Sequence, residues 1–150
     1  MLTVGLLGAG RIGNVHAEAI SHHPGSRLVA VSDAFAPNAE KLAGRYEIDV
    51  KTSQDIIADP TIDAVLIATP TATHSDLIEA ATTAGKAVLC EKPVDLDLAR
   101  AKSCLAIVAQ TGQPVKVGVN RRFDPNFAHL KATLDAGEIG KPELLSVTSF

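Results

Sequence analysis

The chain has 150 residues, a length that suits one complete domain better than two. Apolar residues make up 46% and charged residues 21%, which argues against disorder, and 14 basic against 17 acidic residues leave a net charge of −3. Nucleic-acid binding lacks support, because there is no basic excess and only 3% of the residues are aromatic. No apolar run approaches the roughly 20 residues of a membrane span. The N-terminus lacks the basic segment of a secretory leader. Two cysteines cannot build a disulfide framework. We therefore expect a cytoplasmic protein with no membrane or nucleic-acid partner.

Short apolar runs alternate with longer segments of helical periodicity over the first 120 residues. The apolar runs predict strands at Val4–Leu7, Arg27–Ser32, near Val50, Ala64–Ala68, Ala87–Cys90 and Val115–Asn120. The segments between them predict helices at Arg11–His23 and Pro37–Tyr46, and helices that open at Ser53, Thr73 and Asp95, the last two ending at Gly85 and Gly112. This alternation indicates an α/β fold: a doubly wound parallel sheet of the Rossmann type, with helices on both faces.

The pattern within each run predicts its place in the sheet. The runs at Val4, Ala64 and Ala87 are unbroken, as expected of central strands that are buried on both faces. The run Val115–Asn120 alternates between apolar and polar residues, so one of its faces should be exposed. A doubly wound sheet in the order 3-2-1-4-5-6 places the sixth strand at an edge, in agreement with this alternation.

The character of the sequence changes after Asn120. Asp124 and Pro125 suit the cap and first position of a helix that ends at Gly137, and Glu143–Phe150 is strand-like. We expect residues 1–120 to form a cofactor-binding domain, and residues 121–150 to begin a second α/β domain for substrate binding or oligomerisation, with the remainder absent.

The segment Gly8-Ala9-Gly10-Arg11-Ile12-Gly13 is a complete G-x-G-x-x-G motif between a predicted strand and a predicted helix. In a dinucleotide-binding turn the first glycine permits the tight bend and the second lets the backbone approach a pyrophosphate. The third allows close packing of helix and strand. Free N–H groups at the helix N-terminus then face the phosphates.

Asp33 lies 20 residues after Gly13, at the end of the second predicted strand, where an acid that binds a ribose hydroxyl belongs. Its carboxylate would repel a 2′-phosphate, and no arginine follows among Ala34, Phe35 and Ala36. The sequence thus favours NAD over NADP as the cofactor.

Three motifs in this order resemble those of the Gfo/Idh/MocA oxidoreductases: the glycine-rich turn, Ala68-Thr69-Pro70-Thr71-Ala72-Thr73-His74, and Glu91-Lys92-Pro93. The segment Gly118–Pro125 looks like the inositol 2-dehydrogenase branch of that family. The resemblance covers all 150 residues, which correspond to about the first half of a family member. It implies NAD-dependent oxidation of a CH–OH group of a small polyol or sugar, and a homo-oligomer at full length.

The resemblance also implies roles for individual residues. Lys92 matches the lysine near the nicotinamide and the substrate hydroxyl, and the Lys92–Pro93 bond is expected to be cis. The expected cofactor contacts are Gly8, Gly10, Arg11, Ile12, Gly13, Asp33, Thr69, Pro70, His74, Glu91 and Asn120. Arg122 is a candidate for a substrate hydroxyl, although a solvated or salt-bridged arginine is an equal alternative, and His74 could equally be a surface residue.

Other reactive residue types have simpler interpretations. We expect His16 to pack locally, His22, His23 and His129 to lie on the surface, and Cys90 and Cys104 to belong to the core, with no metal site. The family's D-x-x-x-H proton relay does not occur between Arg121 and Phe150, so we expect the isolated 150-residue chain to be inactive. Two alternatives remain open: a family dehydrogenase for another sugar or polyol, and a non-catalytic NAD-binding module.

Overall fold

A computed structural model describes residues 1–148 and divides the chain into two compact units, Met1–Gly118 and Val119–Phe150. The strands of the first unit are β1 (Leu2–Leu7), β2 (Ser26–Ser32), β3 (Asp49–Val50), β4 (Ala64–Ile67), β5 (Ala87–Cys90) and β6 (Val115–Val117). Its helices are α1 (Arg11–His22), α2 (Ala36–Tyr46), α3 (Ser53–Ala58), α4 (His74–Thr83) and α5 (Leu98–Thr111), and a 3₁₀ turn spans Thr71–Thr73.

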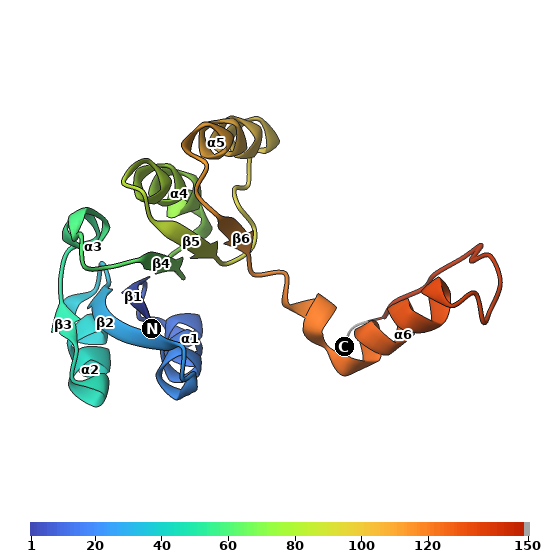
Figure 1. The fold of residues 1–150 in the computed structure, drawn as a ribbon, viewed down its shortest axis with the longest axis horizontal. Coiled ribbons are helices and arrows are strands. Elements are labelled where there is room, and N and C mark those ends of the chain that lie inside the picture. The colour runs from blue at the N-terminus through green and yellow to red at the C-terminus, as the bar shows by residue number, and fades with distance from the viewer. Residues whose placement is uncertain (149–150) are drawn as a thin grey trace. The chain divides into compact units, whose positions relative to one another are not determined.

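The six strands form one sheet in the order β3-β2-β1-β4-β5-β6, and every neighbouring pair is parallel. This confirms the predicted doubly wound topology, with β6 at an edge. Figure 1 shows α1 and α2 on one side of the sheet, and α3, α4 and α5 on the other. The carboxyl ends of β1 and β4 are neighbours, and the chain leaves them toward opposite faces. This is the switch point, where such sheets bind ligands.

Two apolar clusters follow from this arrangement. One joins the sheet to α1 and α2 through residues such as Leu6, Ala17 and Leu42, and the other joins it to α3, α4 and α5 through residues such as Ile56, Ile78 and Cys104. Val88 and Cys90 of β5 belong to the second cluster. Leu89 points to the opposite face and is 37% exposed. The expectation that β5 is buried on both faces is therefore wrong, because α1 and α2 cover the other half of the sheet.

Several helix starts differ from the prediction. Thr52, not Ser53, caps α3 by accepting a hydrogen bond from the Asp55 amide, and Asp97, not Asp95, caps α5 by accepting one from the Arg100 amide. Thr73 precedes α4 as predicted, but its side chain makes no capping bond, because its hydroxyl donates to the carbonyl of Pro70.

The second unit contains a 3₁₀ turn at Asn120–Phe123 and the helix α6 (Pro125–Asp135). Asp124 caps α6 through the amides of Asn126 and Phe127, as predicted from the Asp-Pro pair. Residues 143–148 form no strand, so the prediction for Glu143–Phe150 is wrong over that range, and Ser149 and Phe150 lie outside the described residues. Among residues 1–148, no helix combines the length and apolarity that crossing a bilayer requires.

Candidate functional site: a dinucleotide cleft

The glycine-rich turn connects β1 to α1 in a conformation that requires glycine. Gly8 has φ +100°, and a Cβ on it would lie 2.5 Å from the carbonyl oxygen of Ala68. A Cβ on Gly13 would lie 2.0 Å from the carbonyl oxygen of Gly8, so α1 packs directly on the turn. A Cβ on Gly10, by contrast, would have no atom of residues 1–148 within 4 Å outside its immediate chain neighbours. The first and third glycines therefore serve the fold, while the second faces open space.

The N-terminus of α1 is available to an anion. No side chain among residues 1–148 caps the helix at Gly10, and its first turn contains no acidic residue. The unpaired N–H groups and the helix dipole of such a terminus favour a phosphate. The open space beside Gly10 is the place that a pyrophosphate would fill.

Two polar side chains hold the glycine-rich turn. The amide of Asn14 donates to the carbonyl oxygens of Ala9 and Gly10, at 2.9 and 3.0 Å. The Asp33 carboxylate accepts the N–H of Ala9 at 2.7 Å through Oδ2 and the N–H of Phe35 at 2.8 Å through Oδ1. Each carboxylate oxygen can accept a second hydrogen bond. Asp33 can therefore hold the turn and still accept a ribose hydroxyl.

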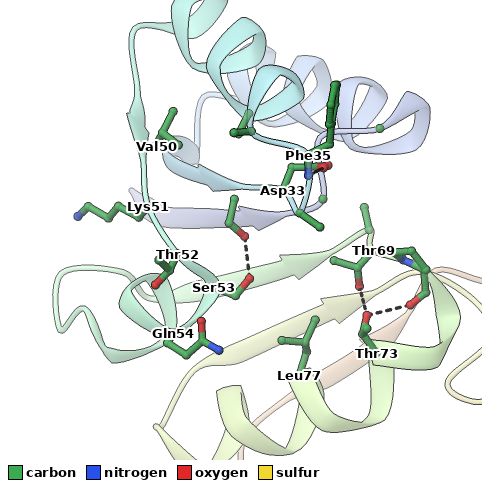
Figure 2. Close-up of a pocket in the computed structure, with 18 of the residues that line it drawn as sticks. Asp33, Phe35, Val50, Lys51, Thr52, Ser53, Gln54, Thr69, Thr73 and Leu77 are labelled. Carbon is green, nitrogen blue, oxygen red and sulfur yellow. Dashed lines mark hydrogen bonds between the residues drawn. The ribbon is translucent and has the colours of Figure 1, made fainter.

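A cleft with a volume of about 1130 Å³ opens along the carboxyl ends of β1, β2 and β4 (Figure 2). Its lining includes seven of the predicted site residues: Gly8, Gly10, Arg11, Ile12, Asp33, Thr69 and Pro70. Phe35 and Val50 add apolar surface near Asp33, and both side chains are exposed. Exposed apolar surface beside an acid that could accept a ribose hydroxyl suits the flat face of an adenine ring.

Lys51, a cation 18 residues beyond Asp33, also lines the cleft. Its ammonium group lies 2.8 Å from the Asp59 carboxylate and 3.7 Å from that of Asp49, and Figure 2 shows the side chain directed away from Asp33. The hydrogen bond to Asp59 raises the pKa of Lys51. This cation is thus paired with two acids and is not free to bind a 2′-phosphate.

The loop after β4 forms the opposite wall of the cleft. The hydroxyl groups of Thr69 and Thr73 lie 2.7 Å apart, and Thr73 donates to the carbonyl of Pro70 at 2.8 Å (Figure 2). These bonds fix the Thr-Pro-Thr turn against the N-terminus of α4. On the side of the cleft formed by β2 and α3, the hydroxyl groups of Ser32 and Ser53 lie 2.8 Å apart.

The Glu91-Lys92-Pro93 segment continues β5 beyond the end of the strand. The Glu91 amide donates to the carbonyl of Ile67 at 2.9 Å, so this segment follows the sheet beside β4. The Lys92–Pro93 bond is cis, as the resemblance implied, and the Lys92 side chain is exposed. Parallel pairing of β4 with β5 brings Lys92 to the same edge of the sheet as the cleft.

Both histidines of this region differ from expectation. His16 does not pack locally: its Nε2 donates to the Glu91 carboxylate at 2.8 Å, across 75 residues of chain. His74 is 1% exposed, so it is not a surface residue. Its two ring nitrogens lie 2.7 Å from the carbonyl oxygen of Pro93 and 2.8 Å from that of Thr69.

The other predicted residues of the first unit do not line the cleft. Gly13 packs behind the turn, and Glu91 and Lys92 follow β5 beyond the cleft lining. Asn120 and Arg122 belong to the second unit, and their roles stay predictions. No group of three or more His, Cys, Asp or Glu side chains within residues 1–148 could hold a metal ion.

Residues 2–119 match the Gfo/Idh/MocA family, described as an oxidoreductase family with an NAD-binding Rossmann fold. The chain belongs to this family. It is 53% identical over 145 residues to an inositol 2-dehydrogenase of Rhizobium meliloti, covering 97% of this chain and 44% of that protein. It is 45% identical over 141 residues to the scyllo-inositol 2-dehydrogenase (NAD(+)) of Bacillus subtilis, covering 91% of this chain and 41% of that protein.

Solved structures that are similar to this chain also include inositol dehydrogenases. The crystal structure of scyllo-inositol dehydrogenase from Lactobacillus casei, with bound NAD(H) and scyllo-inositol, matches with a TM-score of 0.89 and 29% identity, covering 94% of this chain and 43% of that one. A myo-inositol dehydrogenase from Corynebacterium glutamicum matches with a TM-score of 0.86 and 41% identity, over 94% and 43% of the two chains. The chain thus spans less than half the length of the relatives it matches.

Proposed function

We propose that this chain binds NAD and forms the cofactor-binding half of an inositol 2-dehydrogenase, which oxidises myo-inositol to the 2-keto inositol. The main support for the proposal is that its three key features lie at one edge of the sheet. There the glycine-rich turn, Asp33 and Lys92 follow β1, β2 and β5. Relatives named as inositol dehydrogenases, 53% and 45% identical, support the choice of substrate.

The residues present fit a dinucleotide. The open space beside Gly10 and the uncapped N-terminus of α1 would hold the pyrophosphate, and Asp33 would accept a hydrogen bond from the adenosine ribose. Thr69 and Pro70 would line the path toward the nicotinamide. When bound, the nicotinamide would supply the acceptor for the hydride that leaves the alcohol carbon.

Lys92 would contribute the chemistry that this chain adds to cofactor binding. Its exposed side chain would hydrogen-bond the hydroxyl that is oxidised. As a neutral amine, Lys92 would accept the hydroxyl proton while the hydride leaves the carbon. A module that only binds NAD needs the glycines and Asp33 but has no use for a lysine at this position. Residues of the second unit, with Asn120 and Arg122 as candidates, would contact the nicotinamide side and the polyol.

Two further properties belong to the same proposal. We infer that the full-length protein works in the cytoplasm, where NAD is available, and that it assembles as a homo-oligomer. Its partner is a small polyol. A sugar or another polyol in place of myo-inositol is the competing substrate class.

Calorimetric titration of NAD and NADP into the chain tests the cofactor part, with tighter NAD binding expected. Formation of NADH by the full-length protein, with a panel of inositols, sugars and other polyols, tests the reaction. Lys92→Ala should lower turnover by at least about 10²-fold, the lower range for acid–base groups, while Lys116→Ala on the edge strand β6 serves as control. NAD binding without oxidation of any polyol would favour the non-catalytic module, and normal turnover of Lys92→Ala would remove Lys92 from the reaction.

A further inference from the structure

Two histidines contact the residues on either side of Lys92. His16 of α1 donates to the side chain of Glu91, and His74 of α4 contacts the carbonyl oxygen of Pro93. Lys92 itself lies between these two anchored residues. The two helices cover opposite faces of the sheet, as Figure 1 shows, so the segment is held from both sides.

The contact of His16 follows from the alternation of β5. Cys90 points into the cluster shared with α4 and α5, so the next residue, Glu91, points to the face that carries α1. There its Oε1 accepts the Nε2–H of His16 at 2.8 Å, and its Oε2 accepts the backbone N–H of Lys92 at 3.3 Å. The side chains of His16 and Glu91 are 23% and 22% exposed, so water competes only in part for this bond.

The Glu91 carboxylate lies close to the backbone of Gly118. A Cβ on Gly118, at the end of β6, would lie 3.2 Å from Glu91 Oε1 and 3.3 Å from its Cδ. The glycine therefore leaves just enough room for the carboxylate. In this space the carboxylate makes its bonds with His16 and with the Lys92 amide.

The contact of His74 uses the whole imidazole ring. Carbonyl oxygens only accept hydrogen bonds and a neutral imidazole carries one N–H, so the tautomer of His74 decides whether it donates to Pro93 or to Thr69. The ring is 1% exposed and both nitrogens face backbone oxygens, which leaves no nitrogen free for a cofactor. Thr69 lines the cleft. His74 therefore joins the cleft wall to the loop that carries Lys92.

We propose that His16 and His74 are positioning residues that set the place of the Lys92 ammonium group relative to the cleft. This inference rests on the proposed function of Lys92. It replaces the expected direct contact of His74 with the cofactor by an indirect role. Because His16 belongs to the helix whose N-terminus would hold the pyrophosphate, the same helix would place both the cofactor and Lys92.

The variants His16→Leu and His16→Gln test the first contact. Glutamine can place an amide N–H where the His16 Nε2–H lies, and leucine cannot. In the full-length enzyme we expect His16→Leu to lower kcat by about 10- to 100-fold, the effect of a small misplacement of a reacting group, with little change in the KM for NAD. His16→Gln should restore most of this loss. His22→Leu, at the exposed end of the same helix, is the matched control and should have normal kinetics.

The pair His74→Asn and His74→Gln tests the second contact. Asparagine can place an amide N–H near the position of Nδ1, toward Pro93, whereas glutamine reaches the position of Nε2, toward Thr69. Both keep a polar side chain at the buried position. If the bond to Pro93 positions Lys92, His74→Asn should retain a higher kcat than His74→Gln. The reverse order would overturn the role assigned to His74.

An NMR measurement on the 150-residue chain separates this proposal from the proposed function. In a chain labelled with ¹³C-lysine, the ε-methylene signal of Lys92 should shift in His16→Leu and stay in place in His22→Leu. A shifted signal together with normal turnover of Lys92→Ala would keep the positioning role and refute the catalytic one. An unshifted signal and unchanged kcat in His16→Leu, with Lys92→Ala inactive, would refute the positioning role alone.

Discussion

The carboxylate of Asp33 accepts the backbone N–H of Ala9 at 2.7 Å, and so ties the end of β2 to the glycine-rich turn after β1. A second bond, from the N–H of Phe35, fixes the other carboxylate oxygen. An acid at this position would therefore do more than accept a hydrogen bond from a ribose. It shapes the turn proposed to receive the pyrophosphate, and so connects the proposed ribose and pyrophosphate sites.

Replacing Asp33 should change the choice of cofactor. Asp33→Asn keeps an oxygen that can accept the N–H of Ala9 or Phe35 but removes the charge. We expect weaker NAD binding by roughly tenfold or more, since a hydrogen bond to a charged group contributes about 1.5–3 kcal/mol. NADP binding should weaken less or improve, because the repulsion of a 2′-phosphate is lost. Calorimetric titration of both cofactors measures the ratio of affinities.

Glu40→Gln is the control for Asp33→Asn, because it removes one negative charge from an exposed position on α2. Its ratio of NAD to NADP affinity should equal that of the unmodified chain. An unchanged ratio in Asp33→Asn as well would exclude Asp33 from the ribose site.

The three glycines of the turn should respond differently to alanine. Gly13→Ala places a methyl group 2.0 Å from the carbonyl oxygen of Gly8, so α1 must move and the free energy of unfolding should fall. Gly10→Ala meets no described atom within 4 Å, so the chain should keep its stability. The added methyl group would instead occupy the space proposed for the pyrophosphate, and NAD binding should be lost. Denaturant unfolding and calorimetry on the same samples separate the two effects.

Gly44→Ala controls for the general effect of this substitution. Gly44 lies within α2, and a Cβ there has no described atom within 4 Å. Alanine in a helix interior is favoured over glycine by about 0.5–1 kcal/mol, so this variant should be slightly more stable and bind NAD normally. Normal NAD binding by Gly10→Ala would show that the pyrophosphate does not approach this glycine.

The sheet order could be predicted because each strand carries its own signal. Unbroken apolar runs such as Ala64–Ile67 are buried on both faces, and the right-handed crossover rule leaves few arrangements for strands that alternate with helices. The exposure of Leu89 could not be predicted in the same way. It depends on how far α1 and α2 reach across the sheet, which no local pattern in Ala87–Cys90 contains.

The cleft could be predicted where the spacing of residues in the sequence forms a motif, as it does from Gly8 to Asp33. The contacts of His16 with Glu91 and of His74 with Pro93 were not, because they join residues 75 and 19 positions apart on different elements. Position did hold one signal: His16 follows Gly13 by three residues, and so lies one turn further along the helix that packs on the sheet. The predicted cap of α3 was wrong for a different reason. Thr52 and Ser53 are adjacent and both suit a cap, and the bond from Ser53 to Ser32 decides between them.

The carboxylate of Asp59 should make the chain sensitive to acid. Its hydrogen bonds with the Lys51 ammonium group and with Thr61 lower the pKa of Asp59 in the folded state. A group whose folded pKa lies below its unfolded value stabilises the fold above the unfolded pKa, which is about 4 for aspartate. This stabilisation is lost as the pH falls below that value. The free energy of unfolding should therefore decrease from pH 6 to about pH 3.

Asp59→Asn should make this decrease shallower, because the variant has no carboxylate to protonate at this position. Glu40→Gln, whose glutamate is exposed, should keep the original slope. Chemical denaturation at a series of pH values measures both slopes. Equal slopes in Asp59→Asn and the unmodified chain would show that other carboxylates account for the loss of stability in acid.

The two cysteines should be unreactive as long as the chain is folded. Cys90 and Cys104 are fully buried, and burial raises the pKa of the Cys90 thiol to about 12, with the neighbouring Glu91 carboxylate adding to the effect. Burial also raises the pKa of Cys104. Only the thiolate is nucleophilic, so at pH 8 neither cysteine should react with a chromogenic disulfide reagent in native buffer, and both should react at once in denaturant. The single-cysteine variants Cys90→Ala and Cys104→Ala identify each signal.

If both thiols belong to the shared cluster of α4, α5 and β5, they should become reactive together, at the rate at which that cluster opens. Fast labelling of Cys90 alone in the folded chain would show instead that the end of β5 opens independently, and that Lys92 stands on a mobile segment.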